Sequence, residues 1–174
     1  RSLNEKITII ELNDLGIPDM NKILQKALEE FNARFLVAKA SMSNDLLDEK
    51  RKQYNAQKIL YMLHTLKKQN NQQKLIGITN QDIFIDGMNF VFGLASQTAR
   101  ICVVSLHRLV EHQIPTQKEK ERIVKEITHE IGHVYGLQHC TGNCVMTFSN
   151  SVSDVDSKNS ELCTKCKRIV NMFY

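Results

Sequence analysis

The chain has 174 residues, of which 42% are hydrophobic and 24% charged, and its net charge is +4 at neutral pH. This composition is that of an ordinary globular protein with a core of its own, and we expect one domain over residues 1–174. It excludes a membrane span, because no apolar run approaches the roughly 18 residues required. It also disfavours nucleic-acid binding, because the basic residues are mixed with acidic ones instead of forming a patch.

The N-terminal segment lacks the features of a secretion signal. Its apolar run, residues 7–12, is short and is interrupted by Thr8 and Glu11, whereas a signal peptide carries an apolar stretch of about 7–15 residues. We therefore expect a cytoplasmic protein, and we expect it to be a monomer that contacts no membrane.

Strand and helix periodicities alternate through the first half of the chain. Alternating β-branched residues predict strands, and apolar residues spaced three and four apart predict helices. In chain order we expect a strand at Lys6–Leu12, a helix over 19–32, a strand at Arg34–Ala40, a helix over 48–69, strands over 74–79, 89–95 and 100–106, a helix over 117–135, and a final helix near 160–172. This order favours an α+β fold in which helices pack on one side of a twisted, mixed β-sheet.

The most informative segment is residues 129–139, HEIGHVYGLQH. His129 and His133 are four residues apart, so on a helix both imidazoles project from one face. A tetrahedral zinc ion requires this geometry from two nitrogen ligands. We expect Gly136 to end the helix in the left-handed conformation and turn the chain, which would bring His139 in as a third ligand. Three protein ligands leave one position for water, which indicates a catalytic zinc.

A glutamate, Glu130, follows the first histidine of this segment. There its carboxylate can act on the attacking water without binding the metal, so we predict that it is the general base. The alternative is an exposed polar helix face that carries histidines by chance. Gly136 and His139 make that alternative weak, because a helix face requires neither of them.

Four of the five cysteines follow the histidine segment in two closely spaced pairs. Three residues separate Cys140 from Cys144, and two separate Cys163 from Cys166; both gaps are in the range of zinc knuckles. We predict that these four thiolates hold a second, structural zinc ion, which gives two zinc ions per chain. Two disulfides are the alternative, weakened by the missing secretion signal. The fifth, Cys102, stands in an apolar run and is expected to be a core residue.

With these residues identified, the chain resembles the metzincin clan of zinc peptidases and, more narrowly, the archaemetzincins. The clan-level match is the 129–139 segment followed by Met146, which is similar to the clan's Met-turn. One departure is the gap between the first two cysteines, which is one residue shorter than the family's usual form. The narrower match is Cys140 directly after the third histidine, followed by Cys144, Met146 and the pair Cys163 and Cys166. Residues 51–60 and 89–93, which precede this motif, are also similar to the family.

The resemblance implies a metzincin-like fold in which an active-site helix is followed by a short irregular C-terminal part that ends in a helix. The N-terminal part would cover residues 1–136 and the C-terminal part residues 137–174. The edge strand that pairs with an extended peptide would be residues 89–96, and its Phe90 and Phe92 are expected in the core.

The resemblance also implies roles for the residues of the two clusters. The catalytic zinc would be held by three histidines, the structural zinc by four cysteines, and Met146 would pack beneath the catalytic site without binding metal. Glu130 would be the base. The residues concerned are His129, His133 and His139 for the first ion and Cys140, Cys144, Cys163 and Cys166 for the second.

The predicted function is a zinc-dependent metallopeptidase that hydrolyses peptide bonds in peptides or proteins. One alternative is a non-catalytic zinc-binding or interaction protein whose cleft is closed or inactive. Glu130 argues against that alternative, since zinc binding alone does not require it. Another alternative is a nucleic-acid-binding knuckle built on the cysteines, which is weakened by the lack of basic and aromatic residues around them.

Overall fold

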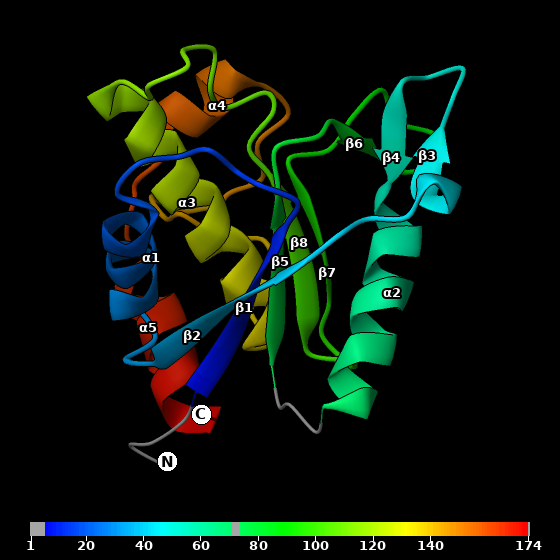
Figure 1. Ribbon diagram of the computed structural model, residues 1–174. Helices are drawn as coiled ribbons and strands as arrows, with labels where there is room; N and C mark the ends of the chain where they lie inside the picture. The colour runs from blue at the N-terminus through cyan, green and yellow to red at the C-terminus, as the bar shows by residue number, and fades with distance from the viewer. Residues whose placement is uncertain (1–5, 71–73, 174) are drawn as a thin grey trace.

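Two β-sheets and five α-helices make up the described part of the chain, residues 6–70 and 74–173 of a computed structural model (Figure 1). The larger sheet is built from β1 (Lys6–Leu12), β2 (Arg34–Ala40), β5 (Leu75–Thr79), β7 (Gly93–Ser96) and β8 (Ile101–Ser105), and the smaller one from β3 (Leu47–Asp48), β4 (Gln53–Asn55) and β6 (Ile83–Phe84). The helices are α1 (Met20–Glu29), α2 (Ala56–Gln69), α3 (Gln117–Val134), α4 (Val152–Ser157) and α5 (Thr164–Phe173), with a 3₁₀ turn at Asn44–Leu46.

The larger sheet is mixed, as predicted. Its strand order is β2-β1-β5-β8-β7, and the first four strands are parallel. The last strand, β7, lies antiparallel to β8, with Gly93 opposite Val104 and Ser96 opposite Ile101. Among the described strands β7 pairs only with β8, so its other backbone edge lies at the border of the sheet.

Helices cover both faces of this sheet, so the prediction that they pack on one side was wrong. In β1, Ile7 and Ile9 pack in one core with α1 and α3, while Ile10 and Leu12 pack in a second core with α2. Figure 1 shows α2 on the opposite side of the sheet from α1 and α3. The reason is that strands of a parallel sheet are apolar on both faces, and both faces must be covered.

The helix predicted over 48–69 begins only at Ala56. Asn55 caps it, since its side chain accepts hydrogen bonds from the backbone N–H of Gln57 (3.0 Å) and Lys58 (3.2 Å). Upstream, the carboxylate of Asp48 accepts hydrogen bonds from two backbone N–H groups of a turn between β3 and β4. Asn and Asp favour such caps and turns over helix interiors.

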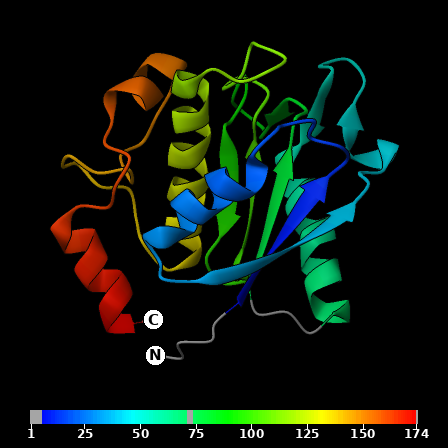
Figure 2. The same cartoon turned by 60° about the vertical axis from the view of Figure 1, so that its left-hand side comes forward.

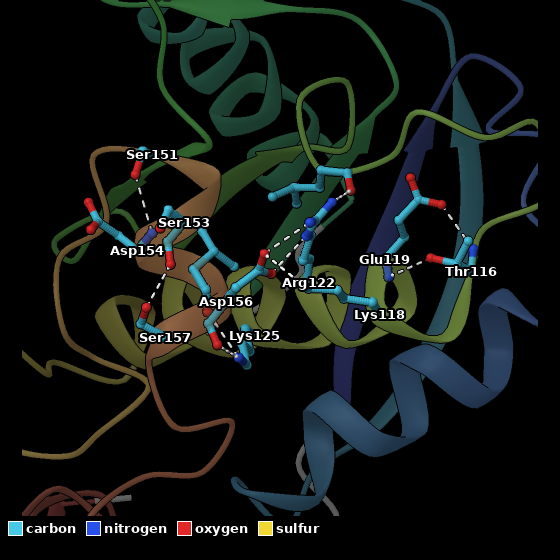
Figure 3. A network of polar contacts seen from close by, with 12 residues as sticks. Thr116, Lys118, Glu119, Arg122, Lys125, Ser151, Ser153, Asp154, Asp156 and Ser157 are labelled. Carbon is cyan, nitrogen blue, oxygen red and sulfur yellow. Dashed lines mark hydrogen bonds and ion pairs between the residues drawn. The ribbon is translucent and has the colours of Figure 1, made fainter.

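The sequence reading missed α4 in the segment expected to be irregular. The side chain of Ser151 caps this helix by accepting a hydrogen bond from the N–H of Asp154 (3.2 Å), and the Ser-x-x-Asp pattern was a signal for it. Arg122 of α3 binds both carboxylate oxygens of Asp156 at 2.8 and 2.9 Å (Figure 3). Lys125 of α3 donates to the carbonyls of Val155 and Asp156.

The helices α1, α3 and α5 lie close to their predicted ranges in the sequence. In space, α4 lies beside the N-terminal half of α3, and α5 lies towards the opposite end of that helix (Figure 2). In the described part of the chain, no helix is both long and apolar enough to cross a membrane.

Candidate metal centre and cleft

The helix α3, which carries His129, Glu130 and His133, has a defined beginning and end. At its start Thr116 accepts a hydrogen bond from the N–H of Glu119 (3.2 Å), and the Glu119 carboxylate accepts one from the N–H of Thr116 (2.9 Å). This reciprocal capping box satisfies two backbone donors that the first turn leaves free (Figure 3). After the last helical residue, Val134, Gly136 adopts a φ of 91°, which turns the chain as predicted.

Three histidines converge beyond this turn. One ring nitrogen from each of His129, His133 and His139 lies within 4.8 Å of the other two. The Nδ1 of His129 is 2.9 Å from the carbonyl of Val145, and the Nδ1 of His133 is 2.8 Å from that of Leu137. A carbonyl can only accept, so both Nδ1 atoms carry the proton, and both Nε2 atoms keep a free lone pair for a metal ion.

The protonation of these histidines fits the same use. Burial lowers the pKa of His129 well below its usual value, and it also lowers the pKa values of His133 and His139. The rings are therefore neutral near pH 7, which is the form that binds zinc. Three neutral imidazoles whose nitrogens lie close together match the donor set of a catalytic zinc.

Glu130 is buried beside the histidines and lines the cleft. Burial, and after it the nearby carboxylate of Glu126, raise the pKa of Glu130 to about 8 against the opposing effect of Lys158. Glu126 is itself paired with Lys158, whose ammonium nitrogen lies 2.9 Å from its carboxylate oxygen, and both side chains are buried. The Lys158 ammonium also donates to the carbonyl of Thr147 (3.2 Å). Sequence reasoning identified neither member of this pair.

Two glycines allow close contacts around the centre. A Cβ at Gly93 of β7 would lie 2.6–2.8 Å from three atoms of the Glu130 side chain. A Cβ at Gly132 of α3 would lie 2.3 Å from the sulfur of Met146, which is fully buried. Met146 therefore packs directly against the active-site helix, which is the packing position expected for it.

The four cysteines of the two pairs form one cluster. All four sulfurs lie within 4.8 Å of one another, with Cys144 and Cys166 buried and Cys140 and Cys163 partly buried. All cysteines of the chain are free thiols, which disfavours the disulfide alternative, and Cys102 is a buried core residue as predicted. A hydrogen bond from the backbone N–H of Cys166 is the largest of the effects that lower the pKa of Cys163 to about 7.

A cleft of about 380 Å³ runs past the histidines and Glu130. One wall comes from residues 85–92 and the first residues of β7, and the other from Phe148, Ser149 and Asn150. The edge strand begins at Gly93, so the expectation of a strand from residue 89 was wrong. Phe92 is buried, as expected, while Phe90 is only partly buried and both rings line the cleft.

Two further side chains at the cleft carried no signal in the sequence. Gln97, just after β7, donates a hydrogen bond to the carbonyl of Leu137 (3.0 Å), which also binds His133. Phe148 is 49% exposed, and the centre of its ring lies 5.2 Å from that of His139. Isolated Gln and Phe residues have no characteristic spacing, and only the fold brings them to the site.

The model of peptidase family M54 matches residues 21–172. The chain belongs to this family. The archaemetzincin of Archaeoglobus fulgidus is 45% identical over 137 residues, which cover 78% of this chain and 81% of that protein. The archaemetzincin of Pyrococcus abyssi is 40% identical and covers 86% of both chains.

Crystal structures of archaemetzincins share the fold as well. The structure from Methanopyrus kandleri superimposes with a TM-score of 0.86 at 33% identity, covering 99% of this chain and 96% of that one. The structure from A. fulgidus, complexed with malonate, gives a TM-score of 0.82 at 38% identity, covering 94% and 99%. This M54 member is thus a zinc metallopeptidase with the metzincin-like α+β fold that its sequence predicted.

Proposed function

We propose that His129, His133 and His139 hold the catalytic zinc and that Glu130 is the general base for peptide-bond hydrolysis. The observation that supports this best is the convergence of three imidazole nitrogens beside an enclosed carboxyl group at the floor of one cleft. His139 is exposed to solvent, so a substrate has access to the centre. That access favours a peptidase over the alternative of a binding protein with a closed cleft.

The metal ion and the chain's own groups would divide the steps of hydrolysis between them. Zinc at this site would supply Lewis-acid polarisation of the scissile carbonyl and lower the pKa of a water. Glu130 accepts the proton of the attacking water and passes it to the leaving amine. The carbonyls of Val145 and Leu137 hold the imidazoles of His129 and His133 in one tautomer and orientation.

The pKa of Glu130 suits a group that both accepts and donates a proton. A value of about 8 lies near neutral pH, and a zinc ion held by the histidines would lower it and favour the ionised carboxylate that accepts a proton. The free edge of β7 offers backbone N–H and C=O groups to a substrate in extended conformation, which is how a peptide adds to a sheet. The substrates are therefore peptides or unfolded segments of proteins.

We further propose that Cys140, Cys144, Cys163 and Cys166 hold a second, structural zinc, giving two ions per chain. Four sulfurs within 4.8 Å of one another provide the donor set of a closed tetrahedral site. Residues 1–174 would act as one domain, with the cleft between an N-terminal part, 1–136, and a C-terminal part, 137–174. The monomeric state and the cytoplasmic location remain predictions.

The test replaces Glu130 with Gln. Glutamine keeps the shape of the side chain but cannot accept the water proton, so hydrolysis of a quenched-fluorescent peptide should fall by about 100- to 10,000-fold. Elemental analysis should find two zinc ions in both the parent and Glu130→Gln, because neither predicted ligand set is touched.

Three results would count against the proposal. Hydrolysis at the parental rate in Glu130→Gln would show that another group is the base. A reproducible content of one zinc ion in the parent would remove the cysteine site. Loss of zinc from Glu130→Gln would show that the carboxyl group is a ligand and not a base.

A further inference from the structure

The wall of the cleft that precedes β7 has little regular structure of its own. Residues 85–92 belong to no helix or strand, although they carry the Phe90 and Phe92 side chains that line the cleft. Backbone hydrogen bonds within and around the segment join Met88 to Ile85 and Val91 to Ile83. Contacts from side chains elsewhere must therefore supply much of its rigidity.

Arg51, in the turn between β3 and β4, binds this wall directly. Its Nη2 donates to the carbonyls of Met88 (2.7 Å) and Asn89 (3.2 Å). Its guanidinium carbon lies 3.9 Å from the centre of the Phe84 ring, so stacking on this ring also holds the forked guanidinium group in place. Its Nε donates to the side-chain oxygen of Gln53 (2.8 Å).

Gln53 continues the network into the interior. Its amide nitrogen donates to the carbonyl of Asn89 (2.8 Å) and to the carboxylate of Asp82 (2.9 Å), and the residue is buried. Asp82 also binds Arg108 through both carboxylate oxygens, at 2.8 and 2.9 Å. The Arg108 guanidinium carbon then lies 4.1 Å from the centre of the Phe90 ring. The wall is thus held at two places. Arg51 and Gln53 bind its backbone carbonyls, and Arg108 stacks on the ring of Phe90.

The wall leads directly into the strand that the substrate would meet. Phe90 and Phe92 contact each other edge to face, with ring centres 5.2 Å apart, and the carbonyl of Phe92 binds the N–H of Ser105 in β8 (2.8 Å). Gly93 then begins β7 against the Glu130 side chain. A shift of residues 88–92 would therefore displace the start of the edge strand relative to Glu130.

We propose that Arg51 is a positioning residue for substrate binding, which acts by fixing the carbonyls of Met88 and Asn89 and, through them, the wall at 85–92. The proposal rests on the proposed peptidase function of the same cleft. It assigns the role to the forked geometry of the guanidinium and not to its charge, because one Arg reaches two carbonyls and Gln53 together.

The experiment compares Arg51→Met and Arg51→Lys with Lys50→Met, which removes an exposed cation from the same turn. The substrate is the peptide that the parent cleaves best in a quenched-fluorescent hexapeptide mixture. Both Arg51 variants should raise KM by about 10- to 100-fold with kcat nearly unchanged, because substrate placement is lost while the catalytic groups stay. Amide hydrogen exchange over residues 85–96 should accelerate by about 10-fold or more. Lys50→Met should match the parent in both measurements.

Each deviation overturns a definite part of the proposal. Unchanged exchange over 85–96 in Arg51→Met would show that Arg51 does not hold the wall. Parental KM in Arg51→Lys would show that charge suffices and the fork does not matter, and a fall in kcat alone would rule out a role in substrate placement. If the parent cleaves no peptide, the proposed function fails, while the exchange measurement still decides whether Arg51 fixes the wall.

Discussion

At the scale of single residues, Gly93 lies directly against the side chain of Glu130. A Cβ on Gly93 would lie 2.6 Å from Cγ of Glu130 and 2.8 Å from Cδ and Oε1. Glu130 is buried and lines the cleft, so a methyl group at position 93 would have to displace its side chain. Glycine is therefore the residue that lets the edge strand approach the proposed base.

We predict that Gly93→Ala displaces the Glu130 carboxyl group and lowers kcat by about 100-fold, as small misplacements of catalytic groups do. The zinc content should stay at the parental value, because no metal ligand is crowded. Steady-state kinetics and elemental analysis on the same preparation check both points.

Gly77→Ala is the matched control. A Cβ at Gly77 would lie 2.9 Å from Leu63 of α2, on the other face of the sheet, so the change crowds the core to a similar extent without reaching the cleft. It should reduce stability and leave kcat unaltered. An equal loss of kcat in both variants would mean that crowding acts through stability and not through Glu130.

At the scale of elements, the active-site helix α3 depends on one carboxylate at its start. Glu119 is buried and accepts hydrogen bonds from the backbone N–H groups of Glu111, His112 and Thr116, and its other contact is the His112 ring. Burial alone would raise the pKa of Glu119, but these hydrogen bonds lower it from the usual 4.5 to about 2. The ionised carboxylate therefore stabilises the folded state.

We predict an acid-dependent loss of stability from this residue. Because the pKa of Glu119 is lower in the folded protein than in the unfolded chain, its contribution is complete above about pH 4.5 and is lost as the pH falls towards 2. Glu119→Gln should reduce the free energy of unfolding by about 1–3 kcal/mol at pH 7. Urea denaturation of both proteins at pH 7 and pH 3 should show this difference narrowing, and a difference independent of pH would contradict the assignment.

At the scale of the whole molecule, the histidine cluster and the cysteine cluster share one loop. Cys140 directly follows His139, and its N–H donates to the carbonyl of Met146 (3.0 Å). Val145, which precedes Met146, makes two hydrogen bonds. Its carbonyl accepts one from the His129 ring, and its N–H donates one to the carbonyl of Glu161. The cysteine cluster also joins this loop to α5, because Cys163 directly precedes that helix and Cys166 lies in its first turn.

We predict that Cys163→Ser combined with Cys166→Ser weakens zinc binding at the histidines by about 10- to 100-fold, because supporting contacts commonly change metal affinity by that much. Competition with a zinc chelator measures the affinity, and circular dichroism checks that the variant is folded. Cys102→Ala removes a buried thiol outside both clusters and should leave the affinity unchanged. A folded double variant with parental affinity would show that the two sites are independent.

Local patterns in the sequence determined most of the longer elements and the candidate ligands. A helix places residues four apart on one face, so His129 and His133 could be paired without knowledge of the fold, and Gly136 marked the turn towards His139. The strands β1, β2, β5 and β8 were predicted from their apolar and β-branched residues, and each lies within or close to its predicted range. The four cysteines were grouped by spacing, although which metal they hold stays a prediction.

Only the tertiary structure decided how the two faces of the sheet are covered and what surrounds the metal ligands. The periodicity of a strand shows that a face is apolar but not which helix packs on it, so α2 was assigned to the wrong side. Glu126 and Lys158, like Arg51 and Asn89, meet across more than thirty residues of chain, and nothing local in either segment specifies its partner. Such contacts exist because the packing of the sheet and helices brings distant segments together, and that packing is a property of the whole chain.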